Sequence, residues 1–171
     1  MVVLLVVAVY SCDNTEKNNL ENDFEAIFAN KSLSDPFAFN YLINTSDGTQ
    51  VQINELQLKS FISGQMMKED KIYKISEYQM KQNPNDDTEF AIVALSHDGE
   101  LTTQIATTIF KTDAGLVVTG KKCKCTSTCS IGCDASFWAG KCHCSRCSGQ
   151  GKECKKESSI ELPDPKEIIA Q

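Results

Sequence analysis

The sequence predicts an α+β fold: an antiparallel β-meander with one or two helices on one face, followed by a small cysteine-rich module. Three observations predict it. Apolar and polar residues alternate in short runs between residues 37 and 119, with turns between the runs. Two stretches have the apolar spacing of helices. Eight cysteines fall within residues 123–154. We therefore expect an α+β domain at residues 20–120 and a basic, cysteine-rich module at residues 121–156.

Two helices are expected in the domain. Apolar residues from Leu20 to Phe28 recur at helical spacing, which predicts a short amphipathic helix over residues 19–30. Asn54 is a good N-cap, and Gln57 three residues later completes a capping box for a second helix. Gly64 is expected to help end that helix.

The strands are expected in sequence order. Alternation from Phe37 to Ile43 predicts a first strand, and residues 45–48 form a turn into its partner at Val51 and Ile53. Further strands are predicted at 71–81, 90–96, 101–109 and 116–119. The nearly continuous apolar run at 90–96 indicates a strand covered on both faces.

Short connections imply antiparallel neighbours. The order is similar to that of cystatin-like or NTF2-like folds, a fold-level analogy that implies no activity.

The net charge of −6 is unevenly distributed. Residues 1–120 carry 8 basic and 17 acidic side chains (−9), residues 121–156 carry 8 and 2 (+6), and residues 157–171 carry 1 and 4 (−3). The basic module indicates a contact with the acidic domain, or a site for an anionic envelope component or a protein partner. Residues 157–171, with Pro163 and Pro165, are expected to form a flexible tail.

The N-terminus has the pattern of an export signal. Val2 to Tyr10 is an unbroken apolar or aromatic run, shorter than the roughly 20 residues that a membrane-spanning helix needs. Ser11 and Cys12 follow, and the chain then turns polar. Val9, Tyr10, Ser11 and Cys12 resemble the lipobox of bacterial lipoproteins.

That resemblance implies a signal peptide at residues 1–11, cleavage before Cys12, and a diacylglyceryl group and a fatty acid such as palmitate on Cys12. Residues 12–19 would then be a flexible tether, and the protein would be held by lipid at the outer membrane or on the periplasmic face of the cell envelope. Export of this kind makes nucleic acid an improbable partner.

The cysteine count agrees with export. Nine cysteines is an odd number, and assigning Cys12 to lipid leaves an even set, which an oxidising compartment favours. The module needs covalent or metal bonds to hold its shape, because its large apolar residues are only Ile131, Phe137 and Trp138. The expected disulfide cysteines, with their pairing open, are Cys123, Cys125, Cys129, Cys133, Cys142, Cys144, Cys147 and Cys154. Bridges inside Cys123-x-Cys125 or Cys142-x-Cys144 would be strained, so we expect these pairs to bond elsewhere.

Two alternatives remain open for the module. The first is a thiolate site for zinc, copper(I) or an iron–sulfur cluster, since soft thiolates select these metals; its ligands would be Cys123, Cys125, Cys142, His143, Cys144 and Cys147. The second is a thiol–disulfide oxidoreductase acting through Cys144-Ser145-Arg146-Cys147, where Arg146 would lower a thiol pKa.

Other catalytic patterns are not apparent in the sequence. No paired carboxylates, triad-like set or phosphate-binding glycine loop stands out. Asp86, Asp87 and Glu89 lack the spacing of a calcium loop and read as a hairpin tip, and His97 reads as a turn residue. We therefore expect a non-enzymatic exported lipoprotein, without a cofactor, that presents a disulfide-stapled module to a partner.

Overall fold

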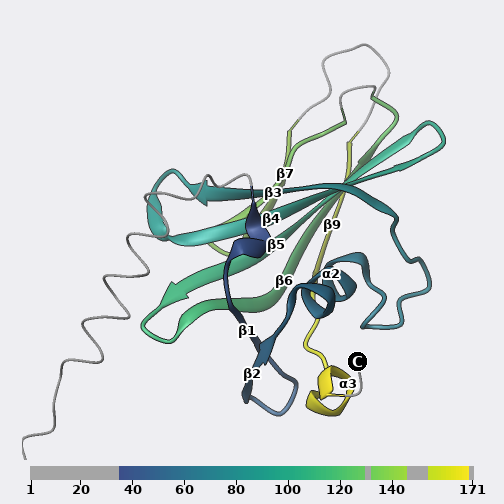
Figure 1. Cartoon of the computed structure of the whole chain (residues 1–171). Helices are drawn as coiled ribbons and strands as arrows, with labels where there is room; N and C mark the ends of the chain where they lie inside the picture. The colour runs from purple at the N-terminus through teal and green to yellow at the C-terminus, as the bar shows by residue number, and fades with distance from the viewer. Residues whose placement is uncertain (1–34, 130–131, 146–153, 170–171) are drawn as a thin grey trace, which may run out of the picture. The chain divides into compact units, whose positions relative to one another are not determined.

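A computed structural model describes residues 35–129, 132–145 and 154–169. The predicted signal peptide, the tether and the helix over residues 19–30 lie outside these residues. Seven strands form one curled, mixed sheet, and two more form a separate hairpin sheet (Figure 1). The elements are η1 (Pro36–Ala38), β1 (Tyr41–Asn44), β2 (Gln50–Ile53), α2 (Glu55–Ser63), β3 (Ile75–Asn83), β4 (Asp86–Asp98), β5 (Leu101–Thr112), β6 (Gly115–Ser127), β7 (Ala135–Trp138), β8 (Lys141–Cys144), β9 (Cys154–Ile160) and α3 (Pro165–Ile169).

The sheet order is β2-β1-β6-β5-β4-β3, with β9 also paired to β6. Strands β3 to β6 form the expected antiparallel meander, joined by short turns. The prediction of an antiparallel sheet throughout is wrong, because β1 pairs with β6 in parallel, from Tyr41–Leu116 to Ile43–Val118. The pairing joins residues far apart in sequence, so local turn signals do not predict it.

The first predicted strand is shorter than expected. Asp35 Oδ1 accepts a hydrogen bond from the Phe37 backbone N at 3.1 Å, and Pro36 begins a 3₁₀ turn at η1. Phe37 therefore packs edge-on against the Tyr78 ring, 4.9 Å between centroids, instead of continuing β1. The turn into β2 and the antiparallel pairing of β2 with β1 are as predicted.

Helix α2 confirms the cap signals. The Asn54 side chain accepts from the Gln57 backbone N at 2.9 Å, and Gln57 Oε1 accepts from the Asn54 backbone N at 2.9 Å. Gly64 ends the helix with a positive φ of 84°, which favours glycine. Leu58, Phe61 and Ile62 are buried on the inner side of the helix.

Strand β6 is shared between two neighbours. Its first part lies beside β1, and Lys121–Ser127 pairs with β9. Gly120 lies at the change of partner with φ +76°, and a Cβ there would come within 2.2 Å of the Glu161 carbonyl oxygen. The boundary expected between residues 120 and 121 therefore falls inside a strand.

The flexible tail predicted for residues 157–171 is also corrected. Residues 157–160 belong to β9, and Ile168 of α3 is buried. Gln57 Nε2 donates to the Ile168 carbonyl oxygen at 2.7 Å, which joins α3 to α2. The sequence did not predict this strand, because β9 consists mostly of charged and polar residues and lacks the alternating apolar pattern of a strand.

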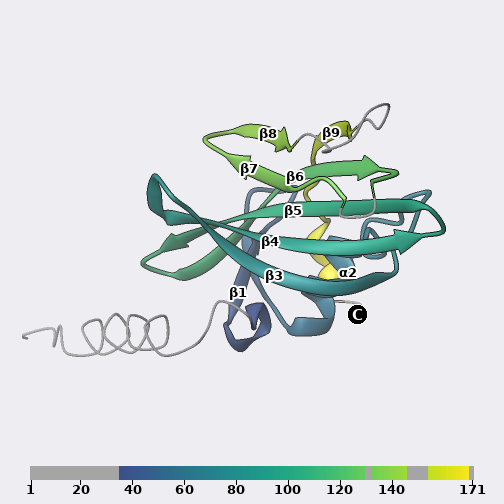
Figure 2. The same cartoon turned by 90° about the horizontal axis from the view of Figure 1, so that it is seen from above.

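Strand β4 is covered on both faces, as predicted from its apolar run. Every residue from Phe90 to Ala94 is buried. The β7–β8 hairpin, with Ala135 opposite Cys144, covers one face of the sheet and stacks above β6 and β5 (Figure 2).

Candidate functional site

Alternate residues of β6 serve opposite faces of the sheet. Cys123 and Cys125 project toward the β7–β8 hairpin, whereas Lys122 and Lys124 project toward the side that carries α2. The cysteine-rich module is therefore continuous with the sheet, and its first two cysteines are part of the sheet's core.

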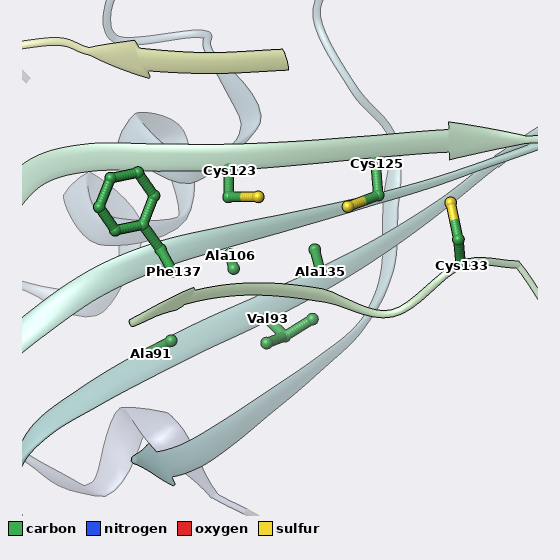
Figure 3. Packing of buried hydrophobic residues seen from close by; sticks show 8 residues of the cluster. All are labelled: Ala91, Val93, Ala106, Cys123, Cys125, Cys133, Ala135 and Phe137. Carbon is green, nitrogen blue, oxygen red and sulfur yellow. The ribbon is translucent and has the colours of Figure 1, made fainter. Parts of the chain in front are cut away.

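The hairpin lies on a floor of small side chains. Ala91 and Val93 of β4 and Ala106 of β5 are buried beside Cys123 and Cys125. Figure 3 shows these side chains facing β7, whose Ala135 and Phe137 point back toward them. Because the floor is made of small residues, the hairpin backbone can approach the sheet to disulfide distance.

Two disulfides join β8 to β6. Cys123 bonds Cys142 with 5.1 Å between Cα atoms, and Cys125 bonds Cys144 with 5.7 Å. We call these two bonds the disulfide ladder. Each Cys-x-Cys pair lies on one face of its strand, so both sulfurs point at the opposite strand and neither pair bridges internally. The expectation of disulfide bonds in this region is confirmed, but two of the cysteines expected to be bonded, Cys133 and Cys154, are thiols.

The remaining cysteines are placed as follows. Cys129 is in a disulfide whose partner lies outside the described residues. Cys133 and Cys154 are thiols, and both pack in the cluster formed by the floor and the hairpin. Cys12 and Cys147 also lie outside the described residues. Cys144 of the Cys144–Cys147 motif is bonded to Cys125.

Polar contacts also fix the hairpin. Gln104 Oε1 accepts from the Ala135 backbone N at 3.1 Å, and Glu89 Oε2 accepts from the Ala139 backbone N at 3.2 Å. Glu89 is buried and also accepts from Asn83. The Glu89 carboxylate therefore helps to hold the hairpin in place. Asp86 and Asp87, by contrast, are exposed.

The ladder brings potential metal ligands together. The sulfurs of Cys123, Cys125 and Cys144 all lie within 4.8 Å of one another. His143 lies on the outward side of β8 and is exposed, so it does not face these sulfurs. A thiolate site would therefore use the four ladder sulfurs, and only after both disulfides were reduced.

The opposite face of β6 holds a charge cluster around a buried lysine. Lys122 Nζ donates to the Phe61 carbonyl oxygen at 2.9 Å, to Glu69 Oε1 at 3.3 Å and to Glu161. It also lies 4.3 Å from the Phe61 ring centroid. Gly64 leaves room for one of the acids, because a Cβ there would lie 2.5 Å from the Glu69 carboxyl group.

The two carboxyl groups differ electrostatically. Burial and a hydrogen bond with Glu161 raise the pKa of Glu69 against the opposing charge of Lys122. Burial acts on Glu161 in the same direction, but the Lys122 ammonium outweighs it and lowers the pKa of Glu161. Glu161 is therefore the carboxylate that pairs most firmly with Lys122.

The cluster lies at a pocket of about 210 Å³. Lys124 pairs there with Glu157 at 2.5 Å, and Glu157 also pairs with Lys155 at 2.6 Å. The pocket is lined by Ile62, Glu69, Tyr73, Ile105, Lys122, Lys124, Glu157, Ser158, Ser159 and Glu161.

Sequence reasoning missed this cluster. Glu69 and Glu161 stand far apart in sequence, and no paired carboxylates were expected. The available signal was the alternation of lysine and cysteine in Lys122-Cys123-Lys124-Cys125, which places the two lysines on one face of a strand.

None of the protein-family models, curated proteins or solved structures compared with the chain matches it. Among the described residues, no helix is long and apolar enough to cross a membrane.

Proposed function

We propose that this chain is an exported lipoprotein of the bacterial cell envelope, lipidated on Cys12, that acts as a binding protein through its stapled β7–β8 hairpin. The disulfide ladder is the observation that carries the proposal. Disulfides persist in oxidising compartments, and two of them here hold the β7–β8 hairpin against the sheet. A rigid, covalently held surface lowers the entropy lost on binding.

The outward surface of the hairpin favours an anionic partner. Lys141 and His143 of β8 are exposed, as is Lys156 of β9, which is paired with Cys125 and so lies on the hairpin side of the sheet. The two strands are neighbours, since the Cys142 sulfur lies 3.4 Å from the Glu157 carbonyl oxygen. Three basic side chains thus lie on adjoining strands, where an anionic envelope polymer or an acidic protein would be attracted.

Export and lipidation are tested in the native cell. Labelled palmitate should be incorporated into the wild-type chain and lost in Cys12→Ala. Intact mass of the purified protein without reductant should be lower than the reduced mass by two hydrogens for each disulfide. A chain recovered from the cytosol with residues 1–11 intact, no lipid and reduced ladder cysteines would contradict the proposal.

Binding is tested with dextran sulfate as a soluble polyanion, titrated calorimetrically into the detergent-solubilised full chain. Lys141→Glu/Lys156→Glu should weaken binding about tenfold at low salt, because two surface charges are reversed within one patch. Lys74→Glu/Lys166→Glu is the matched control, since both lysines are exposed and belong to neither β8 nor β9. Equal weakening by both variants would contradict the hairpin as the binding surface.

A second candidate function is thiolate metal binding, favoured by the close approach of the Cys123, Cys125 and Cys144 sulfurs. Four thiolates could hold zinc or copper(I) in the reduced protein. Elemental analysis of protein isolated without reductant separates the two candidates. One equivalent of metal with four alkylatable ladder thiols would favour metal binding, whereas intact disulfides without metal would favour the stapled hairpin.

A further inference from the structure

Cys133 and Cys154 lie together at the end of the hairpin face. Cys133 is only 1% exposed, while Cys154 is half-buried at the start of β9. Both are thiols, and both pack against the cluster that contains the disulfide ladder. They therefore occupy the same covered face as the ladder without being bonded to it.

The strand register explains why these cysteines meet. Ser127 lies two residues beyond Cys125 on β6, so it faces the hairpin, and it is paired with Cys154 of β9 and with Thr102 of β5. Paired residues of an antiparallel sheet point to the same face, so Cys154 also faces the hairpin.

The chain before β7 passes over this row. Gly132 N donates to the Cys129 carbonyl oxygen at 2.9 Å, and a Cβ on Gly132 would lie 2.9 Å from Thr102 Cγ2. Cys133 follows directly and hydrogen-bonds both Ser127 and Cys154. The Cys133 and Cys154 side chains are thus in contact, beside the residue pair that lies two residues beyond Cys125 on β6.

We propose that Cys133 and Cys154 are a reversible dithiol–disulfide site that is oxidised by exchange with an external disulfide. The inference rests on the proposed function only for the oxidising surroundings that supply such a disulfide. The substrate class is a small disulfide, such as oxidised glutathione, or the active-site disulfide of a thiol oxidoreductase.

Oxidation proceeds in two exchange steps. The Cys154 thiolate attacks one sulfur of the external disulfide, whose S–S bond breaks and releases one thiolate, leaving a mixed disulfide on Cys154. The Cys133 thiolate then attacks the Cys154 sulfur and releases the second external thiolate. Cys133 and Cys154 lose two electrons and two protons, and the external disulfide becomes two thiols.

Accessibility sets the order of the two cysteines. Cys154 can be reached from solvent, whereas Cys133 is covered. Burial and the hydrogen bond that the Cys133 thiol donates to Cys154 also raise the pKa of Cys133 to about 11, so its thiolate forms less readily. Cys154 is therefore the attacking thiol, and Cys133 resolves the mixed disulfide.

The site is tested on the full chain in mixtures of reduced and oxidised glutathione. Samples are quenched with acid, alkylated and digested, and the Cys133–Cys154 cross-linked peptide is quantified by mass spectrometry. We expect one two-electron transition that occurs at a more oxidising ratio than the opening of Cys123–Cys142 and Cys125–Cys144. Singly alkylated Cys133 and Cys154 at every ratio, or Cys154 joined to another cysteine, would overturn the proposal.

Two serine variants test the order of attack, and the ladder keeps the hairpin attached in both. Cys133→Ser should accumulate a glutathione adduct on Cys154, because the resolving thiol is missing. Cys154→Ser should form no adduct on the buried Cys133. An adduct on Cys133 and none on Cys154 would overturn the assignment.

Failure here is distinguishable from failure of the proposed function. If the ladder stays oxidised while Cys133 and Cys154 never bond, the redox site is wrong and the stapled binding protein stands. If the ladder cysteines are themselves thiols in protein isolated without reductant, the proposed function fails, and the glutathione titration still measures the Cys133–Cys154 pair.

Discussion

Lys122 is the residue on which the α2 side of β6 most depends. Its side chain is 5% exposed, and its three polar partners are Phe61, Glu69 and Glu161. Lys122→Met removes the ammonium and leaves two carboxyl groups and a buried carbonyl oxygen without their donor. We expect the free energy of unfolding to fall by about 3–5 kcal/mol, measured by urea denaturation.

Lys124→Met is the control for this change. Lys124 occupies the same face, but its side chain is 30% exposed and its partner Glu157 is 39% exposed. Its loss should cost less than about 1 kcal/mol. If Lys122→Met costs no more than Lys124→Met, the buried cluster does not stabilise the fold.

Glu157 should give a distinct acid response. Hydrogen bonds from Lys124 and Lys155 lower the pKa of Glu157 from 4.5 to about 2. Because the folded state favours the charged form, Glu157 stabilises the fold above pH 4.5, and this contribution is lost as the pH falls toward about 2.

The measurement compares melting temperatures of wild type and Glu157→Gln across this range. The difference should be constant above about pH 5, at most about 3 °C, and should vanish near about pH 2. A difference that does not change with pH would show that Glu157 acts through packing instead of charge.

At the scale of elements, the two disulfides of the ladder should together stabilise the folded state by less than the sum of their separate contributions. Each bond closes a sequence separation of 19 residues, which constrains the unfolded chain by about 3 kcal/mol when it is the only bond. Once one bond is present, the other closes a ring of roughly six residues and adds about 2 kcal/mol.

Replacing Cys123 and Cys142 by serine, or Cys125 and Cys144, should therefore cost about 2 kcal/mol, and replacing all four should cost about 5 kcal/mol. Urea denaturation of the three variants measures the costs. A four-serine variant that loses no more than a two-serine variant would show that the hairpin is held by packing alone.

Across the whole molecule, local signals predicted the elements better than their arrangement. The capping box at Asn54, the meander from β3 to β6 and the doubly covered β4 follow from spacing and turn residues within each segment. The parallel pairing of β1 with β6 and the pairing of β9 with β6 join segments that are far apart in the sequence. The residues near each strand therefore do not predict these pairings by themselves.

The candidate site shows the same limit. Cysteine spacing predicted crosslinks, but the partners of Cys123 and Cys125 depend on the fold of the hairpin over β6. The Lys122 cluster needed three distant segments to meet. Only the tertiary fold brings these segments together.

Residues 122 to 125 of β6 alternate between the two faces of the sheet: the cysteines at odd positions bond the hairpin, and the lysines at even positions face the α2 side. Deleting a single residue upstream of Lys122 in this strand would point the lysines toward the hairpin and the cysteines toward Glu69 and Glu161. The disulfide ladder and the Lys122 cluster would both be lost. Insertions and deletions here can be accommodated only two residues at a time, so the length of β6 is under a parity constraint that no surface loop shares.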